Sequence, residues 1–287
     1  MPPPETLDRA AVAREAGRAA ASYDSVAALT RHIGAELLSR VEYFDLAPRT
    51  VLDLGAGTGH ASRALRARFR AALVIALDLS PGMLAIAARQ ARWPRRFERV
   101  AGDACALPLR SGSIDLVHSS LALPSFADLD AALAEIRRVM TPRGLFLFSA
   151  LGPDTLRELR ESWAAADSAV HVHDFVDMHD LGSALTRAGF AEPVLDVEHY
   201  RRHFESLPAL AAALRAAGAR NAHAARPRGL TTRRRLATLT QAYEGRRENG
   251  RLPATFEVIY GAAFAGEPRA ARAGGEFVVS LDRLLSR

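Results

Sequence analysis

The middle of the chain alternates short apolar runs with segments whose apolar residues recur at helical spacing. The apolar runs have the length of strands and lie at 51–54, 73–77, 100–104, 114–117 and 145–148. The segments 58–69 and 131–140 have helical spacing. Because alternating strands and helices are typical of parallel sheets covered on both faces, the region 50–149 predicts a doubly wound α/β fold.

Both ends of the chain add further elements to this centre. An apolar stripe at helical spacing includes Val12, Ala16 and Tyr23, and a similar stripe continues from Val26 to Phe44. These stripes predict amino-terminal helices that cover a pocket. Near the other end, apolar residues alternate at 256, 258 and 260, which predicts a last strand.

The segment 51–59, VLDLGAGTG, carries the clearest chemical signal. An apolar strand that contains Asp53 leads into three alternate glycines, Gly55, Gly57 and Gly59. Glycines leave backbone amides open to a ligand, and the helix that follows presents its amino end. A dinucleotide fingerprint would need a further glycine at position 60, where the chain has His60, so NAD is a distant alternative.

Polar residues also end the next three strands. Asp78 follows the second strand about 20 residues after the glycines, where a carboxylate can accept hydrogen bonds from ribose hydroxyls. Asp103 ends the third strand and Ser120 the fourth. Since ligands bind beyond the carboxyl ends of parallel strands, these residues predict one nucleoside site.

The spacing G-x-G-x-G resembles motif I of the class I S-adenosylmethionine (SAM) methyltransferases. The resemblance implies a Rossmann-like, mostly parallel sheet of seven strands, with SAM as the cofactor. It also implies that Asp53 lies near the amino acid end of SAM and Asp103 near the adenine amino group. The expected cofactor-binding residues are Asp53, Gly55, Ala56, Gly57, Gly59, Asp78, Leu79, Met83, Gly102, Asp103, Ala104 and Ser120.

Segments outside the centre indicate a particular family within this class of methyltransferases. They read GRAAASYD at 17–24, LFSALGPDTLRELRESW at 147–163, DMHDLGSALTRAGF at 177–190 and LPATFEVIYGAAF at 252–264. In this order they resemble the BioC-type malonyl-[acyl-carrier protein] O-methyltransferases, which begin biotin synthesis by masking the free carboxylate of malonate. Asp154 and Asp177 also suit helix caps, and Gly189 suits a helix end.

The resemblance implies four parts of the chain. Residues 1–45 form amino-terminal cap helices, and 46–152 form the SAM-binding core. Residues 153–253 form a helical substrate region with a further strand, and 254–287 hold the final strand and a tail. The cap helices and the helical insertion are expected to cover the site.

Two departures from the family bear on the substrate. Many relatives read N-L-A-L-Q-W after the fourth strand, whereas this chain has SLALPS at 120–125. Relatives also often carry H-x-N-R-F, whose arginine is thought to pair the malonyl carboxylate, and here the run 171–175 places Asp174 at that position. A desolvated carboxylate needs a cation or several donors. We therefore expect Arg18 and Tyr23, from the matched amino-terminal segment, to serve the substrate.

Charge and composition limit the partners. All 38 basic residues are arginine, and the net charge of +6 favours anionic partners such as an acidic carrier protein, which Arg226 and Arg228 could contact. No nucleic-acid module or interleaved aromatic pattern is visible, so we expect no nucleic acid. No apolar stretch approaches the roughly 20 residues of a membrane span, and no signal peptide is visible. The single cysteine, Cys105, forms no internal disulfide, and we expect a cytoplasmic protein.

The histidines do not indicate a metal. His171, His173 and His179 lie near acids, but their spacing matches no zinc or iron signature. Methyl transfer to a carboxylate also requires no metal.

Three functional hypotheses follow. The leading one is SAM-dependent O-methylation of malonyl-[acyl-carrier protein], or of malonyl-CoA. The second is a protein-arginine hydroxylase of complex I assembly, since those factors resemble the same branch, including the LPATF-like end. The third is a SAM-binding partner protein without turnover, which predicts intact Gly55, Gly57 and Asp78 beside a blocked or unlined substrate channel. The oligomeric state stays open.

Overall fold

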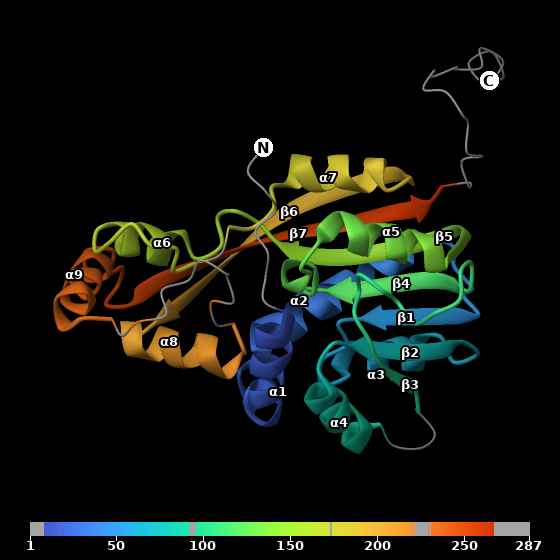
Figure 1. Cartoon of the computed structure of the whole chain (residues 1–287), viewed down its shortest axis with the longest axis horizontal. Coiled ribbons are helices and arrows are strands. Elements are labelled where there is room, and N and C mark those ends of the chain that lie inside the picture. Colours follow the sequence, from blue (N-terminus) through green and yellow to red (C-terminus); the bar gives the residue numbers. More distant parts are fainter. Residues whose placement is uncertain are drawn as a thin grey trace, which may run out of the picture.

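A seven-stranded mixed sheet forms the centre of the computed structural model, which describes residues 9–91, 96–172, 174–219, 221, 229 and 231–266. In chain order its strands are β1 (Thr50–Leu54), β2 (Leu73–Asp78), β3 (Glu98–Ala101), β4 (Ile114–Ser120), β5 (Met140–Leu151), β6 (Phe190–Phe204) and β7 (Leu252–Ala265). Their order in space is β3-β2-β1-β4-β5-β7-β6 (Figure 1). Strands β1 to β5 pair in parallel, and β7 pairs antiparallel with both β5 and β6. The predicted doubly wound, mostly parallel sheet is confirmed.

Helices cover both faces of the parallel strands. One face packs against α5 (Leu129–Val139) and α7 (Met178–Arg187), where Leu133, Ile136 and Leu185 are fully buried. The other face packs against α2 (Ala28–Ser39), α3 (His60–Arg68) and α4 (Pro81–Gln90). The apolar runs form strands here because both faces of each strand lie in apolar surroundings.

The outer half of the β6–β7 hairpin extends beyond the other strands (Figure 1). It carries its own apolar cluster, built with α6 (Arg157–Ala164), α8 (Leu207–Ala216) and α9 (Arg233–Glu244). Tyr243 is fully buried in this cluster, and its hydroxyl donates to the carbonyl of Pro253 at 2.7 Å. The remaining elements are α1 (Arg9–Val26) and the 3-10 turns η1 (Arg40–Tyr43) and η2 (Leu123–Ser125). In the described parts of the chain, no helix is both long and apolar enough to cross a membrane.

Several local boundaries differ from the sequence prediction: β4 and β5 are longer than the apolar runs 114–117 and 145–148, and two further differences have a clear cause. The third strand covers Glu98–Ala101 rather than 100–104, because Asp103 turns the chain by accepting from the amides of Cys105 and Ala106. The second is at α6, where Asp154 was expected to cap the helix. That helix begins after Leu156, and Asp154 accepts from Arg157 instead.

Two predicted helix-end residues lie where expected. The side chain of Asp177 caps α7 by accepting from the amide of His179 at 2.8 Å. Gly189 follows the same helix with a positive φ of 88°.

Close packing of β5 on β7 generates a stability prediction. Gly261 lies opposite Phe148 in the strand register, and a methyl group on Gly261 would overlap the buried Phe148 ring. We expect Gly261→Ala to lower the free energy of unfolding by about 1–3 kcal/mol in urea titrations, because overpacking displaces neighbours. Gly245→Ala is the matched control, since Gly245 has a φ of −61° and its Cβ would meet nothing closer than 3.5 Å. A loss in the control equal to that of Gly261→Ala would contradict this interpretation.

Candidate active site

A cavity of about 500 Å³ opens at the carboxyl ends of the parallel strands. One half is lined by the ends of β1 to β4 and by α1, and we call it the cofactor half. The other half, the acceptor half, continues beneath the β6–β7 hairpin and α8. Its walls are mainly apolar, with side chains from Leu151, Leu156, Leu159, Val172, Phe175, Phe204, Leu214 and Phe256.

The glycines of the turn after β1 have different roles. Gly55 has a φ of 75°, and a Cβ there would overlap the side chain of Ala122, so packing requires this glycine. Gly57 has a φ of 53° and lines the cavity, but a Cβ there would meet nothing within 4 Å. Gly59 precedes α3 with a φ of 77°, and its Cβ would press on Phe97 at 2.9 Å. Gly57 therefore leaves open the space that a ligand could fill.

Asp78 brings a carboxylate to this open space. Its Oδ2 accepts from the amide of Gly57 at 2.8 Å, and its Oδ1 accepts from the amide of Ser80 at 2.7 Å. Burial raises the pKa of Asp78, and the two backbone hydrogen bonds oppose that shift. Each carboxylate oxygen has a further lone pair, so Asp78 can also accept from the hydroxyls of a ribose. The open glycine and the acceptor-only carboxylate together fit the nucleoside part of SAM.

Asp103 also lines the cofactor half, but it already has two partners. One oxygen accepts from the amide of Cys105 at 2.9 Å, and the other lies 2.8 Å from the guanidinium of Arg9. The ion pair connects the beginning of α1 to the turn after β3. The expected adenine-facing acid thus also holds the amino-terminal helix against the cavity.

Asp53 occupies a different place from the one expected. Its side chain is buried, does not line the cavity, and accepts from the hydroxyl of Ser62 in α3 at 2.5 Å. Its other oxygen lies 3.0 Å from Nδ1 of the buried His118 in β4. Asp53 thus connects β1, β4 and α3 behind the glycine turn, and its contact with the cofactor stays a prediction.

The other expected cofactor residues divide in the same way. Ala56 is buried in the apolar cluster on the face of α2 and α3, and neither it nor Gly59 lines the cavity. Five others do line the cofactor half, namely Leu79, Met83, Gly102, Ala104 and Ser120. These five join Gly55, Gly57, Asp78 and Asp103 in the wall of the cofactor half.

Tyr23 lines the cavity from α1. Burial raises the pKa of its phenol, while a hydrogen bond with Thr30 acts in the opposite direction. The phenol is therefore protonated at neutral pH and can donate a hydrogen bond.

The neighbouring Asp24 is a residue that sequence reasoning missed. It accepts from Thr58 at 2.7 Å and from Gln90 at 2.7 Å, so it connects α1 to the glycine turn and to α4. Its position beside Tyr23, in the segment that resembles the family signature, was the available signal.

The structure corrects the expectation for Arg18. Its side chain is 64% exposed, pairs with Glu15 at 2.8 Å, and does not line the cavity. Asp174, at the family's arginine position, is also exposed and absent from the cavity wall, whereas Val172 and Phe175 on either side line it. The acid at 174 therefore does not oppose an anion in the cavity. Arg226 and Arg228 lie outside the described residues.

Three basic side chains among the described residues line the cavity, and none was expected there. Arg9 pairs with Asp103, as described above. Nε2 of His171 lies 2.7 Å from Asp167, and the ring stacks on Trp163 with centroids 3.6 Å apart. Arg202 reaches the acceptor half from β6. Strand alternation could have placed Arg202 on the face of Phe204, but nothing local indicates that this face meets a cavity.

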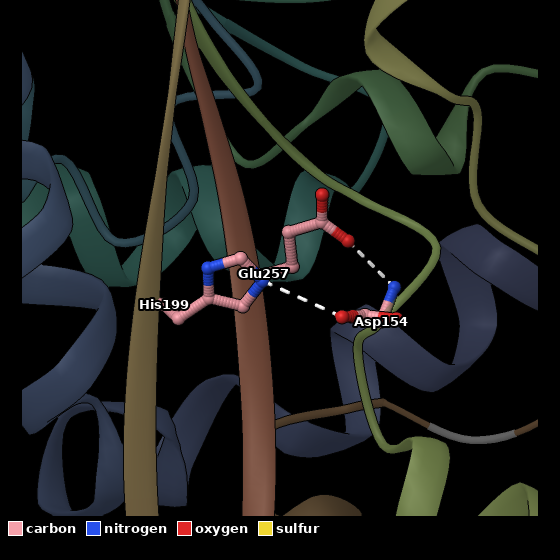
Figure 2. Close-up of side chains that lie close together, drawn as sticks. All are labelled: Asp154, His199 and Glu257. Atoms are coloured by element: carbon pink, nitrogen blue, oxygen red, sulfur yellow. Dashed lines mark hydrogen bonds and ion pairs between the residues drawn. The ribbon is translucent and has the colours of Figure 1, made fainter.

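One group of side chains among the described residues has the composition of a metal site. Asp154, His199 and Glu257 offer ligand atoms within 4.8 Å of one another (Figure 2). These groups already have partners, because Asp154 lies 3.1 Å from Arg157 and 3.5 Å from His199. Glu257 accepts from the amide of Asp154 at 2.6 Å. The contacts hold the chain after β5 against the hairpin without an ion, and we assign no metal to them.

Comparison with known proteins places these features in context. A family model described as a methyltransferase domain matches residues 52–148. The malonyl-[acyl-carrier protein] O-methyltransferase of Methylovorus sp. (strain MP688) is 45% identical over 94% of this chain and 93% of its own length. The protein of the same name from Laribacter hongkongensis (strain HLHK9) is 46% identical over 91% of this chain and 92% of its own length.

Solved structures show the fold alone, because their sequence identity is low. A structure described as a methyltransferase from Bacillus halodurans C-125 has a TM-score of 0.59 and 21% identity, covering 81% of this chain and 99% of its own. The [4+2]-cyclase SpnF has a TM-score of 0.51 and 23% identity, covering 80% of each chain. Proteins that share this fold therefore differ in the reaction that they catalyse. The fold alone does not identify the reaction, so the residues of the acceptor half have to be considered.

The two glycines generate a paired prediction. Gly57→Ala should raise the Kd for SAM about tenfold, because the methyl group enters the open space, while the left-handed backbone costs about 1–2 kcal/mol of stability. Gly55→Ala should lose more stability than Gly57→Ala, since it adds overlap with Ala122 to the same backbone strain. Calorimetric titration with SAM and urea unfolding measure the two effects. Unchanged SAM affinity in Gly57→Ala would contradict the assignment of this space.

Asp78 generates a pH prediction. The ionised carboxylate accepts hydroxyl donors, so SAM affinity should fall as the pH drops through the pKa of Asp78, and burial sets that pKa above the usual carboxyl value. Titrations between pH 8 and 4 measure the fall. Asp78→Asn should bind SAM about 10- to 100-fold more weakly and lose this pH dependence, because a charged acceptor has gone. An unchanged pH profile in the variant would show that another group titrates.

Proposed function

The chain belongs to the family of malonyl-[acyl-carrier protein] O-methyltransferases, and from this premise we propose that it methylates the free carboxylate of malonyl-[acyl-carrier protein] at the start of biotin synthesis. It is a SAM-dependent methyltransferase. Malonyl-CoA is a second form of the same substrate class, because it carries the same malonyl thioester.

The continuous cavity is the observation that carries the proposal. Its cofactor half offers Gly57 and Asp78 to a nucleoside, and its acceptor half provides apolar walls from Phe175, Phe204 and Phe256. A thioester at the end of a narrow arm suits such walls, and a terminal carboxylate suits a hydrogen-bond donor such as Tyr23. The cavity is also inconsistent with the blocked channel expected of a SAM-binding partner without turnover.

The cavity residues suit a displacement that needs positioning rather than proton transfer. SAM, when bound, supplies a methyl group activated by a positively charged sulfur. A carboxylate is already nucleophilic, so no residue has to remove a proton from it. The phenol of Tyr23 is protonated at neutral pH, as that of an ordinary tyrosine is, and burial raises its pKa further, so it can donate a hydrogen bond to the carboxylate. Correct orientation of the two reactants can lower the barrier by roughly 7–11 kcal/mol.

The partner of this reaction is an acyl-carrier protein. The prosthetic arm of a carrier is long and narrow, which suits an acceptor half that continues beneath α8. The net charge of +6 favours association with an acidic protein by long-range attraction.

Mass spectrometry of the carrier tests the proposed reaction. The purified chain with SAM and malonyl-[acyl-carrier protein] should add one CH2, about 14 mass units, to the carrier. The addition should be absent with acetyl-[acyl-carrier protein], which lacks the free carboxylate. Expression of the chain should also restore biotin-independent growth to a strain that lacks this methyltransferase. If neither malonyl-[acyl-carrier protein] nor malonyl-CoA is methylated, the proposal is contradicted.

A further inference from the structure

Arg202 is a cation in the wall of the acceptor half whose side chain has no partner among the described residues. Of the other described basic side chains that line the cavity, Arg9 pairs with Asp103 and His171 contacts Asp167. The side chain of Arg202 forms neither a hydrogen bond nor an ion pair with any residue in the described parts of the chain.

The strand geometry explains why Arg202 reaches the cavity. Arg202 and Phe204 lie on the same face of β6 because successive side chains of a strand alternate, and both line the acceptor half. The residue opposite Arg202 in the register is Ala254 of β7, whose small side chain leaves room for the guanidinium. Arg201 lies on the other face, is absent from the cavity wall, and pairs with Glu248 at 2.6 Å.

Arg202 is itself exposed, and the part of the cavity wall that it joins is apolar. Phe204, Phe256 and Leu214 line the same half of the cavity, and few polar side chains there could satisfy an anion. A carboxylate that leaves water for such a place loses hydration and needs a cation and hydrogen-bond donors in return. A guanidinium supplies both, since its planar fork can donate two parallel hydrogen bonds to a carboxylate.

We propose that Arg202 binds the free carboxylate of the malonyl group and thereby selects malonyl over acyl groups without a charge. The inference rests on the proposed function. It assigns the counter-charge to β6 rather than to position 174, where this chain has an acid outside the cavity wall, or to Arg18, which pairs with Glu15 and does not line the cavity. Arg202 is thus a substrate-binding residue that determines specificity.

The carrier also has a phosphate, which is an alternative anion for Arg202. The whole length of the pantetheine arm separates that phosphate from the acyl group. Malonyl-N-acetylcysteamine contains the malonyl thioester without any phosphate, so comparison of this small substrate with the carrier substrate distinguishes the two anions.

Kinetics of three variants test the assignment. Arg202→Leu should raise KM for malonyl-[acyl-carrier protein] about 10- to 100-fold, because a charged hydrogen-bonding partner is lost. Its SAM affinity and thermal midpoint should match those of the wild type. Arg202→Lys keeps the charge without the fork and should recover part of the loss. Arg201→Leu removes an equal charge from the opposite face and should stay within about twofold of the wild type.

The small substrate decides which anion is bound. Arg202→Leu should raise KM for malonyl-N-acetylcysteamine by the same factor as for the carrier substrate. An effect confined to the carrier substrate would assign Arg202 to the phosphate and overturn the proposal. The proposal would also be overturned if Arg202→Leu left KM unchanged for both substrates, or if it weakened SAM binding by the same factor as it raised KM. If the wild-type chain forms no product, the proposed function itself fails and the inference falls with it, an outcome that is visible before any variant is measured.

Discussion

The parallel pairing of β1 with β2 and β4 is the constraint on which the site depends. It brings the glycine turn, Asp78 and Ser120 to one edge of the sheet, although they are far apart in the sequence. The hydrogen bond from the amide of Gly57 to Asp78 then connects two strand ends across this edge at 2.8 Å. Behind the turn, Asp53 connects β1 to β4 and α3. The turn is therefore held in place before a ligand arrives, which is what preorganised binding requires.

The parallel centre of the fold could be predicted because its signals are local. Each strand is a short apolar run, and each strand end has a polar or glycine residue in the next few positions. The direction of a side chain at a strand end was less predictable, as Asp53 illustrates. It lies one residue before Leu54, which lines the cavity, and alternation directs the carboxylate to the other side. The cofactor class was thus accessible from sequence, whereas the division between contact residues and supporting residues needed the structure.

The acceptor half could not be predicted in the same way, because it depends on contacts between distant segments. The long β6–β7 hairpin, α1 and α8 meet around it, and the pairing of Arg202 with Ala254 spans about fifty residues of sequence. The family resemblance directed attention to Arg18 and position 174, yet neither residue lines the cavity. A cation on β6 can supply the same charge to the cavity from another element. Specificity for an acidic acyl group can therefore persist while the residue that provides it changes.

The central claim is that one cavity holds the cofactor and a malonyl thioester with the carboxylate between them. A crystal structure of the chain with S-adenosylhomocysteine and a non-hydrolysable malonyl-pantetheine analogue tests it most directly. The account predicts the nucleoside beside Gly57 and Asp78, and the malonyl carboxylate against Arg202, with one oxygen directed toward the sulfur. A carboxylate that points to solvent, or an analogue bound outside this cavity, would contradict the account.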